Sequence, residues 1–184
     1  MAAPQCAHGV VAIGSKALRT LRDSLARDLG SEAGVTRLQE VGFTAGEELY
    51  RSFRAWLPTY TDLEDPSELD AAALSEVLSA FFGGLGWGTV RTERVGERGL
   101  TLVSTDWAES PPAGEAHGSC FFSTGLLACF FTLLADGAPL AVMELQCRGQ
   151  GDEECRFLIG SPETLSAVYD AVSRGEDYAT VLGS

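Results

Sequence analysis

Apolar residues recur at steps of three and four through the first half of the chain, which is the spacing of one buried face of an α-helix. The pattern predicts helices over residues 15–29, 34–57 and 67–82. Gly30 is expected to end the first of them, and Pro58 is expected to end the second. Three helices are therefore predicted before any strand.

From residue 87 onward the apolar residues alternate with polar ones, which is the period of a β-strand. Strands over 87–95 and 99–104 are predicted to form a hairpin, because they flank Gly96-Glu97-Arg98-Gly99. The later elements are a buried apolar helix over 120–134, strands over 139–145 and 155–159, and a last helix after Ser161-Pro162-Glu163. This order predicts an α+β fold, with N-terminal helices and an antiparallel sheet into which one buried helix is inserted.

The length of 184 residues suits one domain and requires no second. We therefore assign residues 15–175 to a single domain, 1–14 to a flexible N-terminal tail and 176–184 to a C-terminal tail. The first residues contain neither a basic segment nor an apolar run long enough for a signal peptide, so the protein is expected in the cytoplasm.

The net charge of −13 excludes some classes of partner. The basic residues are scattered rather than gathered on one stripe, so we expect no direct binding to nucleic acid. The most apolar run, residues 121–135, is shorter than the roughly 20 residues that a membrane-spanning helix needs. No membrane span is expected.

The main chemical signal is the set Cys120, Glu144, Cys147 and Cys155. A helix of about 16 residues advances about 24 Å, and the following strand returns most of that distance at about 3.3 Å per residue. Cys120 and Glu144 are therefore expected at the same end of the domain. The glycines between Cys147 and Cys155 permit a tight turn that brings these two thiols together.

Three thiolates and a carboxylate form a plausible tetrahedral set for Zn²⁺, and a set supplied entirely by protein is structural rather than catalytic. Arg148 and Arg156 are expected to offset part of its negative charge, because each follows a ligand in the sequence. The residues alone leave two alternatives open: simple buried thiols, or a disulfide between Cys147 and Cys155. Disulfides are disfavoured by the odd number of cysteines in a chain expected inside the cell.

The spacing Cys120-x4-Gly125, followed by Glu144-x2-Cys147-x-Gly149-x-Gly151-Asp152-x2-Cys155, resembles the end of the 4-vinyl-reductase-type (4VR) domain. This domain also serves as the sensory module of phenol- and xylene-responsive transcription activators, and its fold is similar to that of TRAPP subunits. The resemblance covers roughly residues 107–160. It implies that Cys120, Glu144, Cys147 and Cys155 bind zinc beside a buried pocket for an aromatic effector, and that the protein is a homodimer.

The resemblance also implies residues for the pocket. Trp107, with Ser110 and Glu115-Ala116, is similar to the motif around the pocket tryptophan of the sensors, while Phe130 and Val142 fall at pocket-lining positions. Each of these three candidates is also explained by an ordinary place in the core. The histidine that holds the effector hydroxyl in phenol sensors has no counterpart here, which favours a more apolar ligand.

Three functions are compatible with these observations. The first is a zinc-stabilised sensor that binds a small hydrophobic or aromatic molecule and acts through a separate protein partner. The second is a TRAPP-like scaffold or adaptor without a ligand. The third is an accessory or pigment-binding role in tetrapyrrole metabolism. No catalytic motif is recognisable in the residues, so no enzyme is proposed, and the sequence identifies neither ligand nor partner.

Overall fold

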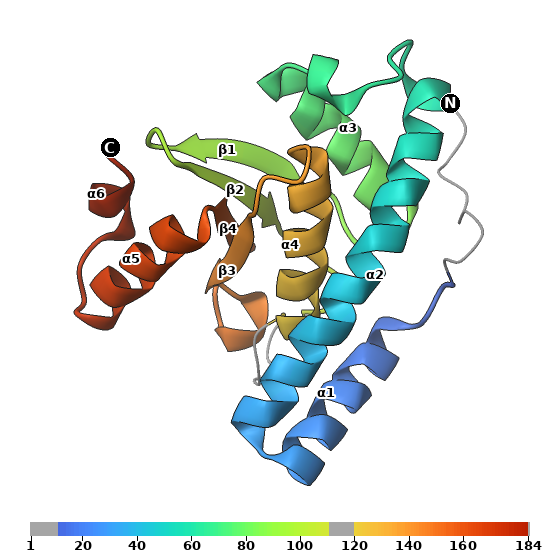
Figure 1. The fold of residues 1–184 in the computed structure, drawn as a ribbon. Coiled ribbons are helices and arrows are strands. Elements are labelled where there is room, and N and C mark those ends of the chain that lie inside the picture. Colours follow the sequence, from blue (N-terminus) through green and yellow to red (C-terminus); the bar gives the residue numbers. More distant parts are fainter. Residues whose placement is uncertain (1–10, 111–119, 184) are drawn as a thin grey trace.

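The computed structural model describes residues 11–110 and 120–183 and shows the predicted α+β fold. The first helices are α1 (Ser15–Leu29), α2 (Ser31–Tyr60) and α3 (Ala71–Gly84), with a short 3-10 helix, η1 (Pro66–Glu68), between the last two. Figure 1 shows α1 and α2 lying side by side, with α4 packed against α2.

The second half of the chain contains one antiparallel sheet in the order β1-β2-β4-β3. Its strands are β1 (Arg91–Val95), β2 (Gly99–Ser104), β3 (Ala141–Gln146) and β4 (Cys155–Gly160). The predicted hairpin between β1 and β2 is confirmed, and Gly96 in its turn has a φ of 59°. The remaining elements are α4 (Phe121–Leu134), η2 (Arg148–Gln150), α5 (Pro162–Ser173) and α6 (Tyr178–Leu182).

The two faces of the sheet bury different sets of side chains, because successive residues of a strand point to opposite faces. Leu102, Phe157 and Ile159 belong to the main core, which they share with residues of α2, α3 and α4. Leu158 belongs to a smaller core with residues of α5 and α6. The described part of the chain therefore has three layers, with the sheet in the middle (Figure 1).

Helices α2 and α4 approach closely through glycines. A Cβ atom placed on Gly125 of α4 would lie 2.0 Å from the carbonyl oxygen of Gln39, and one on Gly42 of α2 would lie 2.1 Å from that of Phe122. Both obstacles are backbone atoms, which cannot rotate away. Gly125 of the sequence motif is thus required by the helix packing.

Three predicted boundaries were wrong. Helix α2 continues past Pro58 to Tyr60, because its last carbonyls accept the Thr59 hydroxyl and the Thr61 N–H. Helix α3 begins at residue 71 rather than 67, because Asp70 caps it by accepting the N–H of Ala73 at 2.8 Å. Strand β1 begins four residues later than predicted, after a loop in which Gly86 and Gly88 have positive φ angles.

The segment 176–184, assigned to a tail, contains the short helix α6, whose Leu182 is buried in the smaller core. None of the described helices combines the length and the apolar character needed to cross a membrane.

Candidate metal centre and the adjoining aromatic layer

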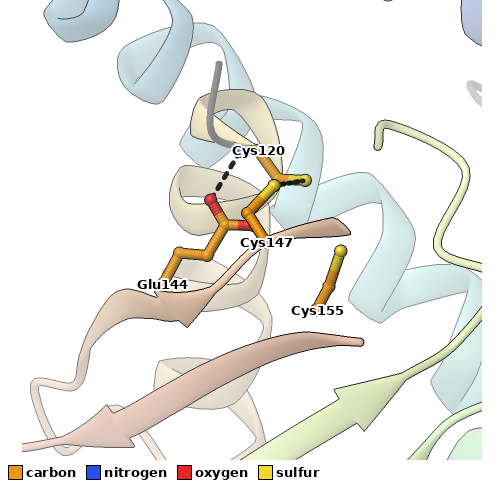
Figure 2. Close-up of side chains that lie close together, drawn as sticks. All are labelled: Cys120, Glu144, Cys147 and Cys155. Carbon is orange, nitrogen blue, oxygen red and sulfur yellow. Dashed lines mark hydrogen bonds between the residues drawn. The ribbon is translucent and has the colours of Figure 1, made fainter. Parts of the chain in front are cut away.

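The structure brings together all four residues of the predicted metal set. Cys120 precedes α4, Glu144 lies on β3, Cys147 follows β3 and Cys155 begins β4. One ligand atom from each of them lies within 4.8 Å of the other three. Figure 2 shows the sulfur atoms of Cys120 and Cys147 facing each other, with the Glu144 carboxylate and the Cys155 sulfur on two further sides.

The turn between Cys147 and Cys155 is held by its own backbone and side chains. The carbonyl oxygen of Cys147 accepts the N–H groups of Gln150 and Asp152, and the N–H of Cys147 donates to the Asp152 carboxylate at 2.7 Å. Gly151 has a φ of 107°, which a residue with a side chain rarely adopts. This turn carries the two thiols to the same point as the start of α4.

The spacing of the sulfur atoms matches a zinc site. The Sγ atoms of Cys120 and Cys147 are 3.9 Å apart. Tetrahedral zinc with Zn–S bonds of about 2.3 Å holds two sulfurs about 3.8 Å apart. The described cysteines are free thiols, so the alternative of a Cys147–Cys155 disulfide is not supported.

The electrostatics of the cluster also suit a cation. Burial, followed by the charge on Cys147, raises the pKa of Glu144 to about 8. Hydrogen bonds with the other two thiols and burial raise the pKa of Cys120. The pKa of Cys155 is instead lowered to about 3, because the thiols of Cys120 and Cys147 donate hydrogen bonds to it. The buried donors resist sharing negative charge unless a positive ion neutralises it.

Glu144 has one oxygen engaged and one available. Its Oε2 accepts the N–H of Cys120 at 2.8 Å. Its Oε1 is buried and has no hydrogen-bond partner within the part of the chain that is described. A buried carboxylate oxygen without a donor is costly, and a metal ion bound by the three thiolates would satisfy it. The residues present therefore fit a zinc ion.

The expectation that Arg156 offsets charge at this cluster was wrong. Cys155 is buried with the main core, whereas Arg156, the next residue of the strand, points to the opposite face. Its guanidinium forms ion pairs with Glu93 and Glu154 at 2.7 and 2.6 Å. Strand alternation, which adjacency in sequence does not reveal, separates this charge from the thiols.

The candidates Trp107 and Phe130 lie together in a continuous set of buried aromatic rings. Both contact Phe82, with ring centroids 5.6 and 5.4 Å away, and their own exposure is 1% and 0%. We call this set the aromatic layer; it consists of Phe53, Trp56, Phe81, Phe82, Trp107 and Phe130. The two side chains are enclosed by other rings.

The third candidate, Val142, lies apart from the aromatic layer. It is half-buried on β3 and borders a surface hollow of about 570 Å³, together with Gln39 and Phe43 of α2. The structure therefore brings Trp107 and Phe130 into one cluster but gives Val142 a different surrounding.

A second hollow, of about 450 Å³, adjoins the aromatic layer. Its lining is mostly apolar and includes Leu49, Trp87, Phe122 and Leu126. The ring of Trp87 lies 5.5 Å from that of Trp107, centroid to centroid. This hollow therefore reaches the aromatic layer through one tryptophan ring.

Two polar side-chain atoms near these rings have no hydrogen-bond partner within the described part of the chain. They are Ser52 Oγ and Trp56 Nε1, and both are buried. Residues four positions apart in a helix lie on the same face, so the two atoms belong to one strip of α2.

Sequence reasoning missed Glu109, which is 3% exposed. Its carboxylate accepts the N–H groups of Phe122 and Ser123 at 3.1 and 2.7 Å, and the Ser123 hydroxyl. Burial raises its pKa to about 7. Acidic residues favour helix N-termini, but the helix that Glu109 caps begins twelve residues later in the chain, which hid the relationship.

Several residues considered in the sequence lie outside the described ranges. These are Cys6, His8, Glu115, Ala116 and His117.

Comparisons with known proteins agree with this fold. Residues 105–161, which include all four residues of the cluster, match the sequence profile of the vinyl-4-reductase (4VR) domain. This match confirms the resemblance drawn from the cysteine spacing, and it covers less than a third of the chain. A search of curated proteins found no match.

Two solved structures have a similar fold. One is the phenol-responsive sensory domain of the transcription activator PoxR with phenol, with 18% identity and a TM-score of 0.62 over 84% of this chain and 77% of that one. The other is a vinyl-4-reductase family protein from Methanocaldococcus jannaschii, with 16% identity and a TM-score of 0.51 over 82% and 83%. At these identities the likeness shows the fold alone.

Proposed function

Because residues 105–161 match the 4VR domain, we propose that this protein is a zinc-stabilised domain that binds a small hydrophobic or aromatic molecule and signals to a separate protein partner. Cys120, Glu144, Cys147 and Cys155 would hold the zinc ion. We further propose, from the family resemblance, that the protein acts as a cytoplasmic homodimer.

The observation that carries the proposal is the position of the donor cluster beside the aromatic layer. The four protein donors leave no ligand position for a substrate, so a bound zinc ion would supply folding energy rather than catalysis. Cys120 begins the helix on which Phe130 of the aromatic layer lies. The metal would thus fix one wall of the region in which we place the ligand.

The chemistry of this region favours an aromatic ligand that carries a hydrogen-bond acceptor. The apolar hollow beside Trp87 has about 450 Å³, within the range of small-molecule pockets. The indole N–H of Trp107 already donates to Ser123. Trp56 Nε1 and Ser52 Oγ, in contrast, have no described partner, and a carbonyl or ether oxygen of a ligand would satisfy them.

A thermal-shift screen of aromatic, terpenoid and tetrapyrrole compounds tests the proposal. Ligand binding to the folded state raises the melting temperature by mass action, so hits are expected among aromatic compounds with an acceptor oxygen. Trp107→Phe and Trp87→Leu should weaken these hits without releasing metal. Tyr169→Ala, which removes an exposed ring on α5, is the matched control and should leave them unchanged.

The tight enclosure of Trp107 and Phe130 favours one alternative, a scaffold or adaptor without a ligand. That function predicts that no compound raises the melting temperature, while affinity purification from cells recovers a defined protein partner. Such a pair of results would replace the sensor proposal with the adaptor.

A further inference from the structure

Glu109 lies between two parts of the molecule that have no described side-chain hydrogen bond with each other. On one side, its carboxylate accepts the hydroxyl of Ser123, and the Ser123 oxygen accepts the indole N–H of Trp107 at 2.8 Å. On the other side, the same carboxylate accepts the N–H groups of Phe122 and Ser123 in the first turn of α4. Trp107 and the start of α4 are therefore joined through one buried acidic side chain.

The first turn of α4 is also bound to the metal cluster. Cys120, the residue before the helix, donates its N–H to Glu144 and contributes its sulfur to the cluster. The N–H groups at this helix start are thus divided between two carboxylates, Glu144 of the cluster and Glu109 outside it. A change in metal–ligand bond length at Cys120 must move the groups that Glu109 accepts.

The loop that carries Glu109 is held on both sides of it. Asp106 accepts the N–H of Thr89 at 2.8 Å, and the N–H of Ala108 donates to the Trp87 carbonyl at 2.8 Å. Ser110, the next residue after Glu109, hydrogen-bonds Cys155 of the cluster. This short loop cannot follow α4 freely, so a displacement of the helix start is transferred to the hydrogen bonds within it.

We propose that Glu109 is a positioning residue that couples the metal site to Trp107 through Ser123 and the first turn of α4. The inference rests on the proposed function, because it requires the cluster to bind a metal. Coupling between two sites is reciprocal. A change at the metal therefore alters the environment of the Trp107 indole, and a ligand that repositions Trp107 alters the affinity for metal.

Exchange of Zn²⁺ for the larger Cd²⁺ in the full chain tests this coupling while keeping the protein folded and the ion charge constant. The readout is the indole N–H signal of Trp107 in a ¹⁵N-labelled sample, assigned with Trp107→Phe. We expect this signal to shift by more than its line width on exchange. In Ser123→Ala and Glu109→Gln the shift should fall below the line width, although both variants still bind one metal ion.

Thr124→Ala is the matched control, because it removes a hydroxyl from the same helix turn that bonds Gln39 and Phe121 instead of Glu109. It should keep the wild-type shift, and the Trp56 indole serves as an internal reference. An unmoved Trp107 signal in metal-loaded wild type overturns the coupling and leaves the metal site standing. Equal shifts in Ser123→Ala and wild type overturn the role of Glu109, and Ser123→Ala decides alone if Glu109→Gln does not fold. Failure to bind either ion rejects the metal site and the coupling together.

Discussion

Two buried carboxylates share the start of α4, and their surroundings give them different uses. Both oxygens of Glu109 accept hydrogen bonds from residues of the helix. Glu144 accepts one N–H and keeps a second oxygen without a described donor, directed at three thiols. Only Glu144 is therefore equipped to bind a metal, while Glu109 is equipped to hold the helix.

The raised pKa of Glu109 predicts a pH dependence of stability. Because its pKa rises from 4.5 to about 7 on folding, the folded state binds the proton more strongly than the unfolded state. The resulting stabilisation is present below about pH 4.5 and is lost as the pH rises through 7. We expect the free energy of unfolding of wild type, minus that of Glu109→Gln, to fall by about 2 kcal/mol between about pH 5 and about pH 7.5.

Urea unfolding of both proteins at several pH values measures this difference, and the subtraction removes the contribution of the metal ligands, which both contain. Glu68→Gln is the control for losing one exposed carboxylate. A difference that stays constant, or that grows with pH, would show that Glu109 is charged in the folded protein at low pH and that its burial has been misjudged.

At the scale of residues, the sequence was informative where spacing and chemistry coincide. The turn between Cys147 and Cys155 and the return path from Cys120 to Glu144 follow from element lengths, so the cluster could be predicted as a set. The partners of Glu109 and Arg156 could not be predicted. Each depends on which face of the sheet or which helix end lies opposite in three dimensions, and adjacency in the sequence carries no such information.

At the scale of elements, the contact between α2 and α4 determines where the metal cluster and the aromatic layer lie relative to each other. Gly42 and Gly125 allow the two backbones to touch. Leu38, Leu49 and Leu127 fill the main core on both sides of this crossing. A shift of α4 along α2 would move Cys120 at its start and Phe130 in its middle together.

We therefore predict that Gly125→Ala destabilises the protein strongly. The added methyl group would meet the Gln39 carbonyl, and overpacking against backbone forces the helices apart at a cost of about 3 kcal/mol. Gly83→Ala in α3 is the control, because its Cβ would meet nothing closer than 3.8 Å and alanine favours a helix. Chemical denaturation that gives both variants the same midpoint would contradict the close approach of α2 and α4.

The elements themselves could be predicted from periodicity and capping, and the misplaced boundaries have a common cause. Pro58 ordinarily ends a helix, but here the ring of Tyr60 stacks on the buried Trp56, with centroids 4.6 Å apart. Tertiary packing of this kind continues α2 by one further turn. The local sequence shows the proline but not the ring that outweighs it.

At the scale of the whole molecule, the described layers divide the labour between stability and binding. The smaller core under α5 and α6 closes one face of the sheet. The opposite face carries Cys155 and Phe157 toward the cluster and the aromatic rings. A zinc ion at the cluster would join α4, β3 and β4, three elements that meet only at this end of the main core, and its binding energy would contribute to folding.

The central claim is that the cluster holds one zinc ion per chain, and native mass spectrometry of the full chain, purified from cells under reducing conditions, tests it most directly. We predict one zinc per chain, two per homodimer, in wild type and in Cys129→Ala, whose thiol lies in α4 outside the cluster. Cys155→Ser should lose most of the metal, because it removes one of the three sulfur ligands. A folded wild-type protein that carries well under one equivalent of any transition metal would contradict the account.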